Sequence, residues 1–185
     1  LLDEVPSEHL QVVIDGANLF HEGELPQMQE ILDEGQPFKE NAAMQIVLEV
    51  AEVLSYLASK KIVHRDVKPA NMMLNAQGQA KLCDLGLARS IISEHTTSSG
   101  SAAGTPAYMS PEQAMGHKLD GRSDLYSLGA VMYALLSGKP PFSSPSIVQV
   151  IHRLRHDPPP SLLDAQLDVP RELNHIVQQL LSKSP

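Results

Sequence analysis

The clearest pattern in the chain is a series of small and apolar residues three and four positions apart, between residues 41 and 58. The positions that follow this spacing are Ala43, Ile46, Val47, Val50, Leu54, Leu57 and Ala58. Residues at this spacing lie on one face of a helix. Lys60 and Lys61 follow, where cations interact favourably with the negative end of the helix dipole. We therefore predict a helix that begins near residue 41, buries one face and is closed by these lysines.

A second segment, residues 123–138, is apolar on almost every side. It stops at Gly138, just before Pro140 and Pro141, which is the usual order of residues at the end of a helix. This segment predicts a central helix that is buried all round.

Three other segments give weaker helical patterns. A short helix is expected around residues 26–33, and an amphipathic helix with a basic tip over residues 146–156. The third helix, over residues 171–183, follows the proline-rich stretch "DPPPS".

Short apolar runs bounded by turn residues predict a few strands. Residues 10–15 have the pattern of a buried strand that ends at Gly16. Residues 72–74 and 80–83 flank "NAQGQ" and predict a hairpin that turns around Gly78.

The segment after this hairpin has a different composition. Residues 88–104 are rich in Ser, Thr, Gly and Ala, which predicts a mobile loop with little to bury. Taken together, the patterns predict an α+β fold that is mainly α, with short strands clustered around residues 64–86.

Composition narrows the class of protein. The 185 residues suffice for one domain or a large piece of one, and 42% hydrophobic with 19% charged residues is typical of globular chains. A formal net charge of −8 disfavours nucleic-acid binding, which needs a basic face. No apolar run is long enough for a membrane span. Cys83 is the single cysteine, so no internal disulfide can form, and we expect a reducing, cytoplasmic setting.

The first ten residues, "LLDEVPSEHL", lack the basic and apolar regions of a signal peptide. The chain begins with Leu1, and we interpret it as a piece of a longer protein.

The densest group of chemically useful residues is "HRDVKPAN", residues 64–71. Asp66 is a carboxylate that can accept a proton or orient a hydroxyl, and Lys68 can neutralise charge on a phosphoryl group. Asn71 offers an amide oxygen to a hard cation, and the hairpin should return Asp84 beside it. Such oxygen ligands suit Mg²⁺, which keeps several waters and also binds substrate phosphates. The combination indicates phosphoryl transfer, in which positioning and electrostatics do most of the catalysis.

Four motifs occur in order along the chain: "HRDVKPAN" at 64–71, "DLG" at 84–86, "GTPAYMSPEQ" at 104–113 and "DGRSDLYSLG" at 120–129. Together they resemble the C-terminal lobe of a eukaryotic-like serine/threonine protein kinase, of the bacterial type. The resemblance covers roughly residues 10–185. It implies a kinase-like helical lobe with a small β-hairpin at the catalytic site, ATP and Mg²⁺ as cofactors, and a protein substrate with a serine or threonine acceptor.

The resemblance implies a catalytic role for several residues. Asp66 would accept the proton of the substrate hydroxyl, and Lys68 would contact the γ-phosphate. Asn71 and Asp84 would hold Mg²⁺, and Thr105 would brace Asp66.

Other positions match the nucleotide site and the supporting structure of the family. Met73 would form the floor under adenine, and the hinge at its edge would fall at Ile14, Asp15 and Gly16. The remaining matches are structural: His64, Leu85, Gly86, Glu112 and Asp124. Among these, Asp124 would hydrogen-bond the backbone of the catalytic loop, and Leu85 stands where many kinases have Phe.

Arg65 suggests regulation, because a guanidinium beside a catalytic aspartate needs an anion that a phosphorylated loop can supply. By analogy with bacterial relatives, the acceptors would be Thr97 and Ser99. The alternative is that this Ser/Thr cluster is an ordinary flexible loop. Cys83 likewise has a simpler interpretation, as a small buried residue beside the nucleotide pocket.

The chain departs from the family pattern at both ends. No glycine-rich loop precedes residue 10, no strand lysine or helix glutamate is visible for ATP, and the arginine that would pair with Glu112 is absent. We therefore expect residues 1–185 to be a partial kinase domain, hinge and C-lobe, which alone transfers phosphate weakly or not at all. A scaffold without catalysis is the alternative, against which the intact Asp66, Lys68, Asn71 and Asp84 argue. A small-molecule kinase is disfavoured by residues 104–113.

Overall fold

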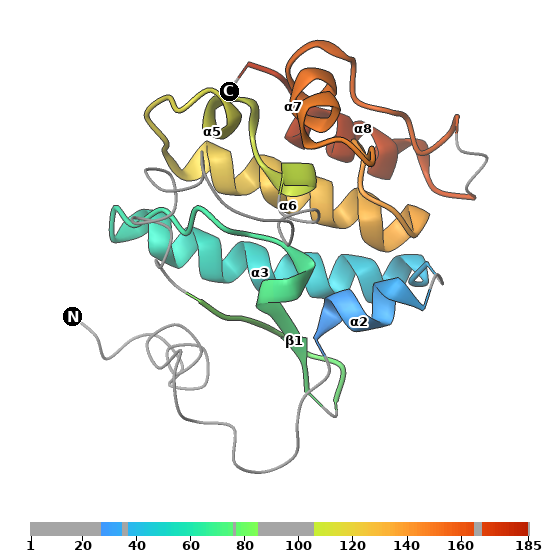
Figure 1. Ribbon diagram of the computed structural model, residues 1–185. Helices are drawn as coiled ribbons and strands as arrows, with labels where there is room; N and C mark the ends of the chain where they lie inside the picture. Colours follow the sequence, from blue (N-terminus) through green and yellow to red (C-terminus); the bar gives the residue numbers. More distant parts are fainter. Residues whose placement is uncertain (1–26, 35–36, 76, 85–105, 165–167, 185) are drawn as a thin grey trace.

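The computed structural model describes residues 27–34, 37–75, 77–84, 106–164 and 168–184 (Figure 1). Its helices and strands follow in this order: α2 (Met28–Asp33), α3 (Glu40–Ser59), the 3-10 turn η1 (Pro69–Asn71), β1 (Met72–Leu74), β2 (Ala80–Leu82), the 3-10 turn η3 (Pro106–Tyr108), α5 (Pro111–Ala114), α6 (Gly121–Ser137), α7 (Ile147–His156) and α8 (Arg171–Leu180). This mainly helical arrangement with one small antiparallel sheet confirms the predicted fold class.

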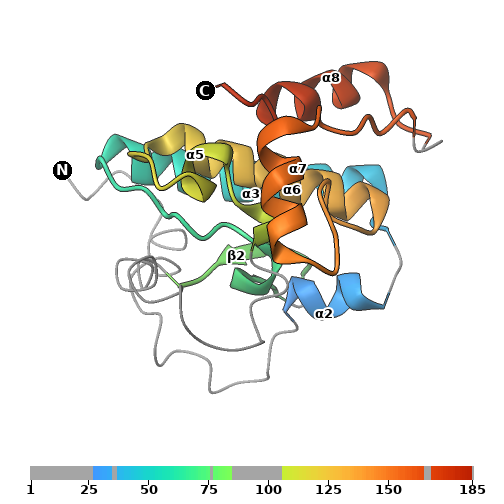
Figure 2. The same ribbon diagram turned by 45° about the horizontal axis from the view of Figure 1, so that its top comes forward.

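Two long helices, α3 and α6, pack side by side through the middle of the molecule (Figures 1 and 2). The predicted apolar face of α3 is buried from Ala43 to Leu57. Ala58 is the exception, since it is exposed. It lies in the last turn of α3 opposite Gly121, which has no side chain to cover it. The helix ends at Ser59, directly before the two lysines that were expected to close it.

Helix α6 is buried on almost every side, as its sequence predicts. It begins two residues earlier than the apolar pattern, because the Asp120 carboxylate accepts a hydrogen bond from Arg122 N at 2.9 Å and caps the first turn. It ends at Ser137 and is capped by Gly138, whose φ of 77° is left-handed and therefore suits glycine.

The last two helices lie on the far side of α6 from α3 (Figure 1). Helix α7 packs against η3 and α5, and α8 packs against α6. Helix α8 ends at Leu180 rather than at the predicted residue 183. Beyond its end, Lys183 Nζ donates a 2.6 Å hydrogen bond to Leu154 O and lies 3.8 Å above the centre of the Phe142 ring. Lys183 thus contacts α7 and Phe142 from beyond the end of α8.

The predicted hairpin is present, although β2 ends at Leu82, one residue early. Met72 pairs with Leu82 and Leu74 with Ala80, and the turn contains Gly78 with a φ of 79°. The Glu49 carboxylate of α3 accepts a 2.6 Å hydrogen bond from Ala80 N and so ties the hairpin to the helical core. The predicted strand at 10–15 and the loop at 88–104 lie outside the described residues.

By length and composition, α3 is the one helix among the described residues that could cross a membrane. The core helices of soluble proteins pass the same test, and the apolar face of α3 packs against α6. The expectation that the chain contains no membrane span therefore stays a prediction.

Candidate active site

The segment from His64 to Asn71 connects α3 to the hairpin, and Asp124 fixes its beginning. Asp124 lies in the first turn of α6 and is only 3% exposed. Its Oδ2 accepts a hydrogen bond from His64 N and its Oδ1 one from Arg65 N, both at 2.8 Å. Burial raises the pKa of Asp124, while the two backbone amides act in the opposite direction. The central helix thus holds two successive peptide groups of the loop.

The His64 side chain braces the same loop from inside. It is 1% exposed, its Nε2 lies 3.1 Å from Cys83 O, and its Nδ1 accepts a 3.3 Å hydrogen bond from Asp66 N. Because Nδ1 accepts and Nε2 faces a carbonyl oxygen, the ring must be neutral with its proton on Nε2. Burial lowers the pKa of His64, which favours this neutral form.

Asp66 is held through one of its two carboxylate oxygens. Its Oδ2 lies 2.8 Å from Lys68 Nζ and accepts a 2.8 Å hydrogen bond from Asn71 Nδ2, which also donates to Asp66 O at 2.8 Å. Within the part of the chain that the structure describes, Oδ1 has no hydrogen bond or ion pair. Since 31% of the side chain is exposed, Oδ1 remains able to accept a proton from an approaching hydroxyl.

The hairpin register places Asn71 beside Cys83, the residue before Asp84. Asn71 O accepts a 2.8 Å hydrogen bond from Cys83 N, and Asp84 follows directly, two residues beyond the end of β2. Asn71 is 7% exposed and uses only its amide nitrogen in its two side-chain hydrogen bonds, which leaves its amide oxygen for a cation. Asp84 has a φ of 62° and is exposed.

One amide oxygen and one carboxylate fit a divalent cation of the Mg²⁺ type, which completes its shell with water and phosphate oxygens. Among the described residues, no group of three or more His, Cys, Asp or Glu could hold a metal. The assignment of a metal site to Asn71 and Asp84 therefore stays a prediction.

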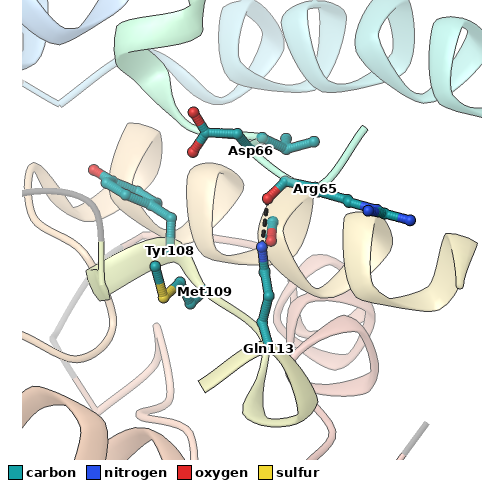
Figure 3. Close-up of a pocket in the computed structure, with 7 residues that line it drawn as sticks. Arg65, Asp66, Tyr108, Met109 and Gln113 are labelled. Carbon is teal, nitrogen blue, oxygen red and sulfur yellow. Dashed lines mark hydrogen bonds between the residues drawn. The ribbon is translucent and has the colours of Figure 1, made fainter. Parts of the chain in front are cut away.

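A small cavity lies beside Asp66, between the loop and the segment that leads into α5 (Figure 3). Arg65, Asp66, Tyr108, Met109 and Gln113 line it, and its volume of about 10 Å³ is close to that needed for one water. The Tyr108 side chain is buried, and this burial raises the pKa of its hydroxyl. The end of the motif "GTPAYM", at Tyr108 and Met109, thus lies beside the same small cavity as Asp66.

The Arg65 guanidinium points away from Asp66 (Figure 3). Arg65 lines a surface cavity of about 270 Å³ together with His117 and Lys118, so three basic residues border this cavity. Within the described ranges, its buried Nε has no hydrogen-bond partner. The arrangement can bind an anion.

The remaining predicted residues are less informative. Met73 is half-buried on β1, opposite Lys81. The other predicted positions lie outside the described residues: Ile14, Asp15, Gly16, Leu85, Gly86, Thr97, Ser99 and Thr105.

Sequence reasoning missed the partners of two residues in α5. Glu112, expected to lack its usual arginine, accepts a 2.6 Å hydrogen bond from the buried Ser123 Oγ of α6. Gln113 donates from Nε2 to the backbone oxygen of Arg65. The spacing of Ser110 and Gln113 could have predicted a capping box, but no local pattern indicates the contact with Arg65.

Comparison with known proteins extends these observations. A family model described as the protein kinase domain matches residues 9–185. The chain is 39% identical over 175 residues to the serine/threonine-protein kinase PknB of Mycobacterium leprae, which covers 93% of this chain and 26% of that protein. It is 39% identical over 162 residues to a probable serine/threonine-protein kinase of Streptomyces coelicolor, which covers 85% of this chain and 24% of that protein. The chain therefore spans about a quarter of the length of these curated relatives.

Proposed function

Because the chain belongs to the protein kinase domain family, we propose that the protein containing it transfers the γ-phosphoryl group of ATP to serine or threonine hydroxyls of other proteins. The bacterial serine/threonine kinases among its relatives confirm the resemblance inferred from the motifs. The observation that carries the proposal is the orientation of Asp66, whose Oδ2 is held by Lys68 and Asn71 while Oδ1 stays accessible.

In this proposal, Asp66 Oδ1 accepts a hydrogen bond from the substrate hydroxyl and takes its proton as the oxygen attacks phosphorus. Lys68 has its ammonium group 2.8 Å from the same carboxylate, so it can neutralise charge that develops on the transferred group. The hydrogen bonds from Asn71 and the bracing of the loop by Asp124 and His64 keep the carboxylate in place.

Asn71 and Asp84 would hold the divalent cation, which we propose is Mg²⁺. When bound, it would neutralise phosphate charge and orient the phosphates of ATP. Met73 would lie under adenine, Ile14, Asp15 and Gly16 would form the hinge, and Thr105 would brace Asp66; these assignments rest on the family pattern alone.

The test uses the full-length gene product, incubated with labelled ATP, Mg²⁺ and a general protein substrate, followed by identification of the phosphorylated amino acid. Phosphoserine and phosphothreonine are expected, with loss of the product in Asp84→Ala. Exposed Asp164 provides a matched control, and Asp164→Ala should retain activity. Nucleotide binding without any transfer would contradict the proposal and favour the scaffold alternative.

The chain of 185 residues has a narrower role in this proposal. We expect it to contribute the hinge and C-lobe of a kinase domain in the cytoplasm, and to transfer phosphate weakly or not at all by itself. Activity of the isolated chain equal to that of the full-length protein would contradict this expectation.

We also propose that Arg65 responds to phosphorylation of Thr97 or Ser99. The cationic cavity that it lines with His117 and Lys118 supports this proposal. Phosphopeptide mapping of active protein should find phosphate at one of these positions, and Arg65→Gln should reduce the gain in activity that follows incubation with ATP. An active protein with an unmodified loop would refute the regulatory role.

A further inference from the structure

The side chain of Gln113 forms hydrogen bonds at both ends. Its Oε1 accepts a hydrogen bond from Ser110 N at 3.3 Å, and its Nε2 donates to Arg65 O, 48 residues away in the sequence. A reversed amide would place its nitrogen against an N–H group and its oxygen against a carbonyl, so the two partners fix the orientation. Its own backbone N–H donates to Ser110 Oγ at 3.3 Å and completes the capping box of α5.

The contact with Arg65 falls on the peptide group that leads into Asp66. The carbonyl of this peptide accepts from Gln113, and its N–H donates to His64 Nδ1 at 3.3 Å, near the long end of the hydrogen-bond range. Both ends of the peptide are thereby held, and its plane sets the direction in which the Asp66 side chain leaves the backbone.

The conformation of Arg65 makes such an anchor necessary. Its φ of 70° is in the left-handed region, which is unfavourable for a residue with a Cβ and persists only where the surroundings impose it. Asp124 holds the N–H of Arg65 and Gln113 holds its carbonyl. Loss of the carbonyl contact would let the peptide rotate toward a less strained conformation.

The helix that carries Gln113 is itself fixed. Glu112, the preceding residue, accepts the hydrogen bond from Ser123 of α6, and Tyr108 and Met109 line the same small cavity as Asp66 (Figure 3). The hydrogen bond from Gln113 therefore connects α5, and the segment with Tyr108 and Met109 before it, to the loop that carries Asp66.

We propose that Gln113 is a positioning residue for Asp66, which acts by hydrogen-bonding the Arg65 carbonyl and so couples α5 to the catalytic loop. The inference rests on the proposed kinase function for its catalytic consequence. Its structural part, the restraint of the loop, stands independently of that function.

Gln113→Glu separates the two roles of this side chain. Glutamate keeps an oxygen for Ser110 N and is equally suited to a capping box, but it has no N–H for the Arg65 carbonyl. Gln113→Met fills similar space with neither group and excludes an effect of the added charge. Ser110→Ala is the matched control, because it removes the capping hydroxyl while the backbone N–H of residue 110 and the Gln113 amide remain.

Each variant is made in the full-length protein, and kcat and KM for ATP and a protein substrate are measured with the melting temperature. We expect kcat to fall about 10- to 100-fold in both Gln113 variants, as for a misplaced catalytic group, with KM for ATP within about twofold. Ser110→Ala should lower the melting temperature and keep kcat within about twofold. An unchanged kcat in Gln113→Met, or an equal fall in Ser110→Ala, would overturn the proposal.

Amide hydrogen exchange of residues 64–71 in the same proteins gives a readout that does not depend on catalysis. Exchange in this segment should be faster in both Gln113 variants than in the parent and in Ser110→Ala. Parental exchange in Gln113→Met would refute the restraint. If the parent protein transfers no phosphate, the proposed function fails, and the exchange comparison still decides the role of Gln113.

Discussion

Asp124 provides the sharpest stability test, because one buried carboxylate satisfies two backbone amides of the loop. Asp124→Ala leaves His64 N and Arg65 N without their acceptor. Asp124 is only 3% exposed, so water has little access to replace it. Asp124→Asn keeps one acceptor oxygen and turns an NH₂ group toward the other amide. The two variants therefore remove two hydrogen bonds and one hydrogen bond respectively.

The expected magnitude follows from the cost of a buried donor without a partner, about 1–3 kcal/mol. Asp124→Ala should then lower the free energy of unfolding by about 2–6 kcal/mol, and Asp124→Asn by roughly half as much. Against a typical total of about 5–15 kcal/mol, the alanine variant could lose most of its folded population. Burial disfavours the charged form of Asp124 and so raises its pKa. The alanine variant no longer buries this carboxylate, which offsets part of the loss of stability.

Urea unfolding of the two variants and of Asp164→Ala measures these differences. The midpoint should fall in the order Asp164→Ala, Asp124→Asn, Asp124→Ala, with the m-value unchanged. If Asp124→Ala is no less stable than the exposed control, the argument that this carboxylate holds the loop is wrong.

Three further predictions concern packing and pH. Gly129→Ala would place a Cβ 2.6 Å from Leu180 Cβ, so overpacking of about 1–3 kcal/mol should exceed the gain in helix propensity of about 1 kcal/mol; a higher melting temperature would contradict this. Burial lowers the pKa of His64 below its ordinary 6.5, so below that pH the unfolded chain binds more protons and the free energy of unfolding should fall as pH falls. His64→Gln should weaken this dependence, and identical pH profiles would refute it. Burial lowers the pKa of Lys183 from 10.5 to about 8, so the unfolded state binds more protons between these values and stability should rise with pH across that window. Lys183→Met should lack the rise, and a parallel rise in that variant would exclude Lys183 as its source.

The sequence predicts the elements of this fold well, because each depends on a short-range pattern. The apolar face of α3, the buried α6 and the hairpin all follow from periodicity and turn residues. The periodicity of apolar residues predicts the ends of helices less exactly than their existence. Helix α6 begins early because Asp120 caps it, and the chain leaves α8 early, before Lys183 reaches Leu154.

In the candidate site too, the sequence predicts the contacts that depend on short-range patterns and misses those that depend on packing. The hydrogen bond between Asn71 and Cys83, the residue before Asp84, follows from the hairpin register, which the turn around Gly78 predicts. The contacts of Arg65 with Asp124 and Gln113 join residues 59 and 48 positions apart, and they depend on how α5 and α6 pack. The family resemblance suggested the first contact, whereas nothing in the local sequence indicates the second.

The most direct test of the central claim, that Asp66 is the proton acceptor in phosphoryl transfer, is the rate of transfer by Asp66→Asn in the full-length protein. Asparagine keeps the shape of the side chain but cannot accept the proton as a carboxylate does. We predict that kcat falls by about 10²- to 10⁴-fold, while the dissociation constant for ATP with Mg²⁺ changes little. Transfer to serine or threonine at the parental rate by Asp66→Asn would contradict the account.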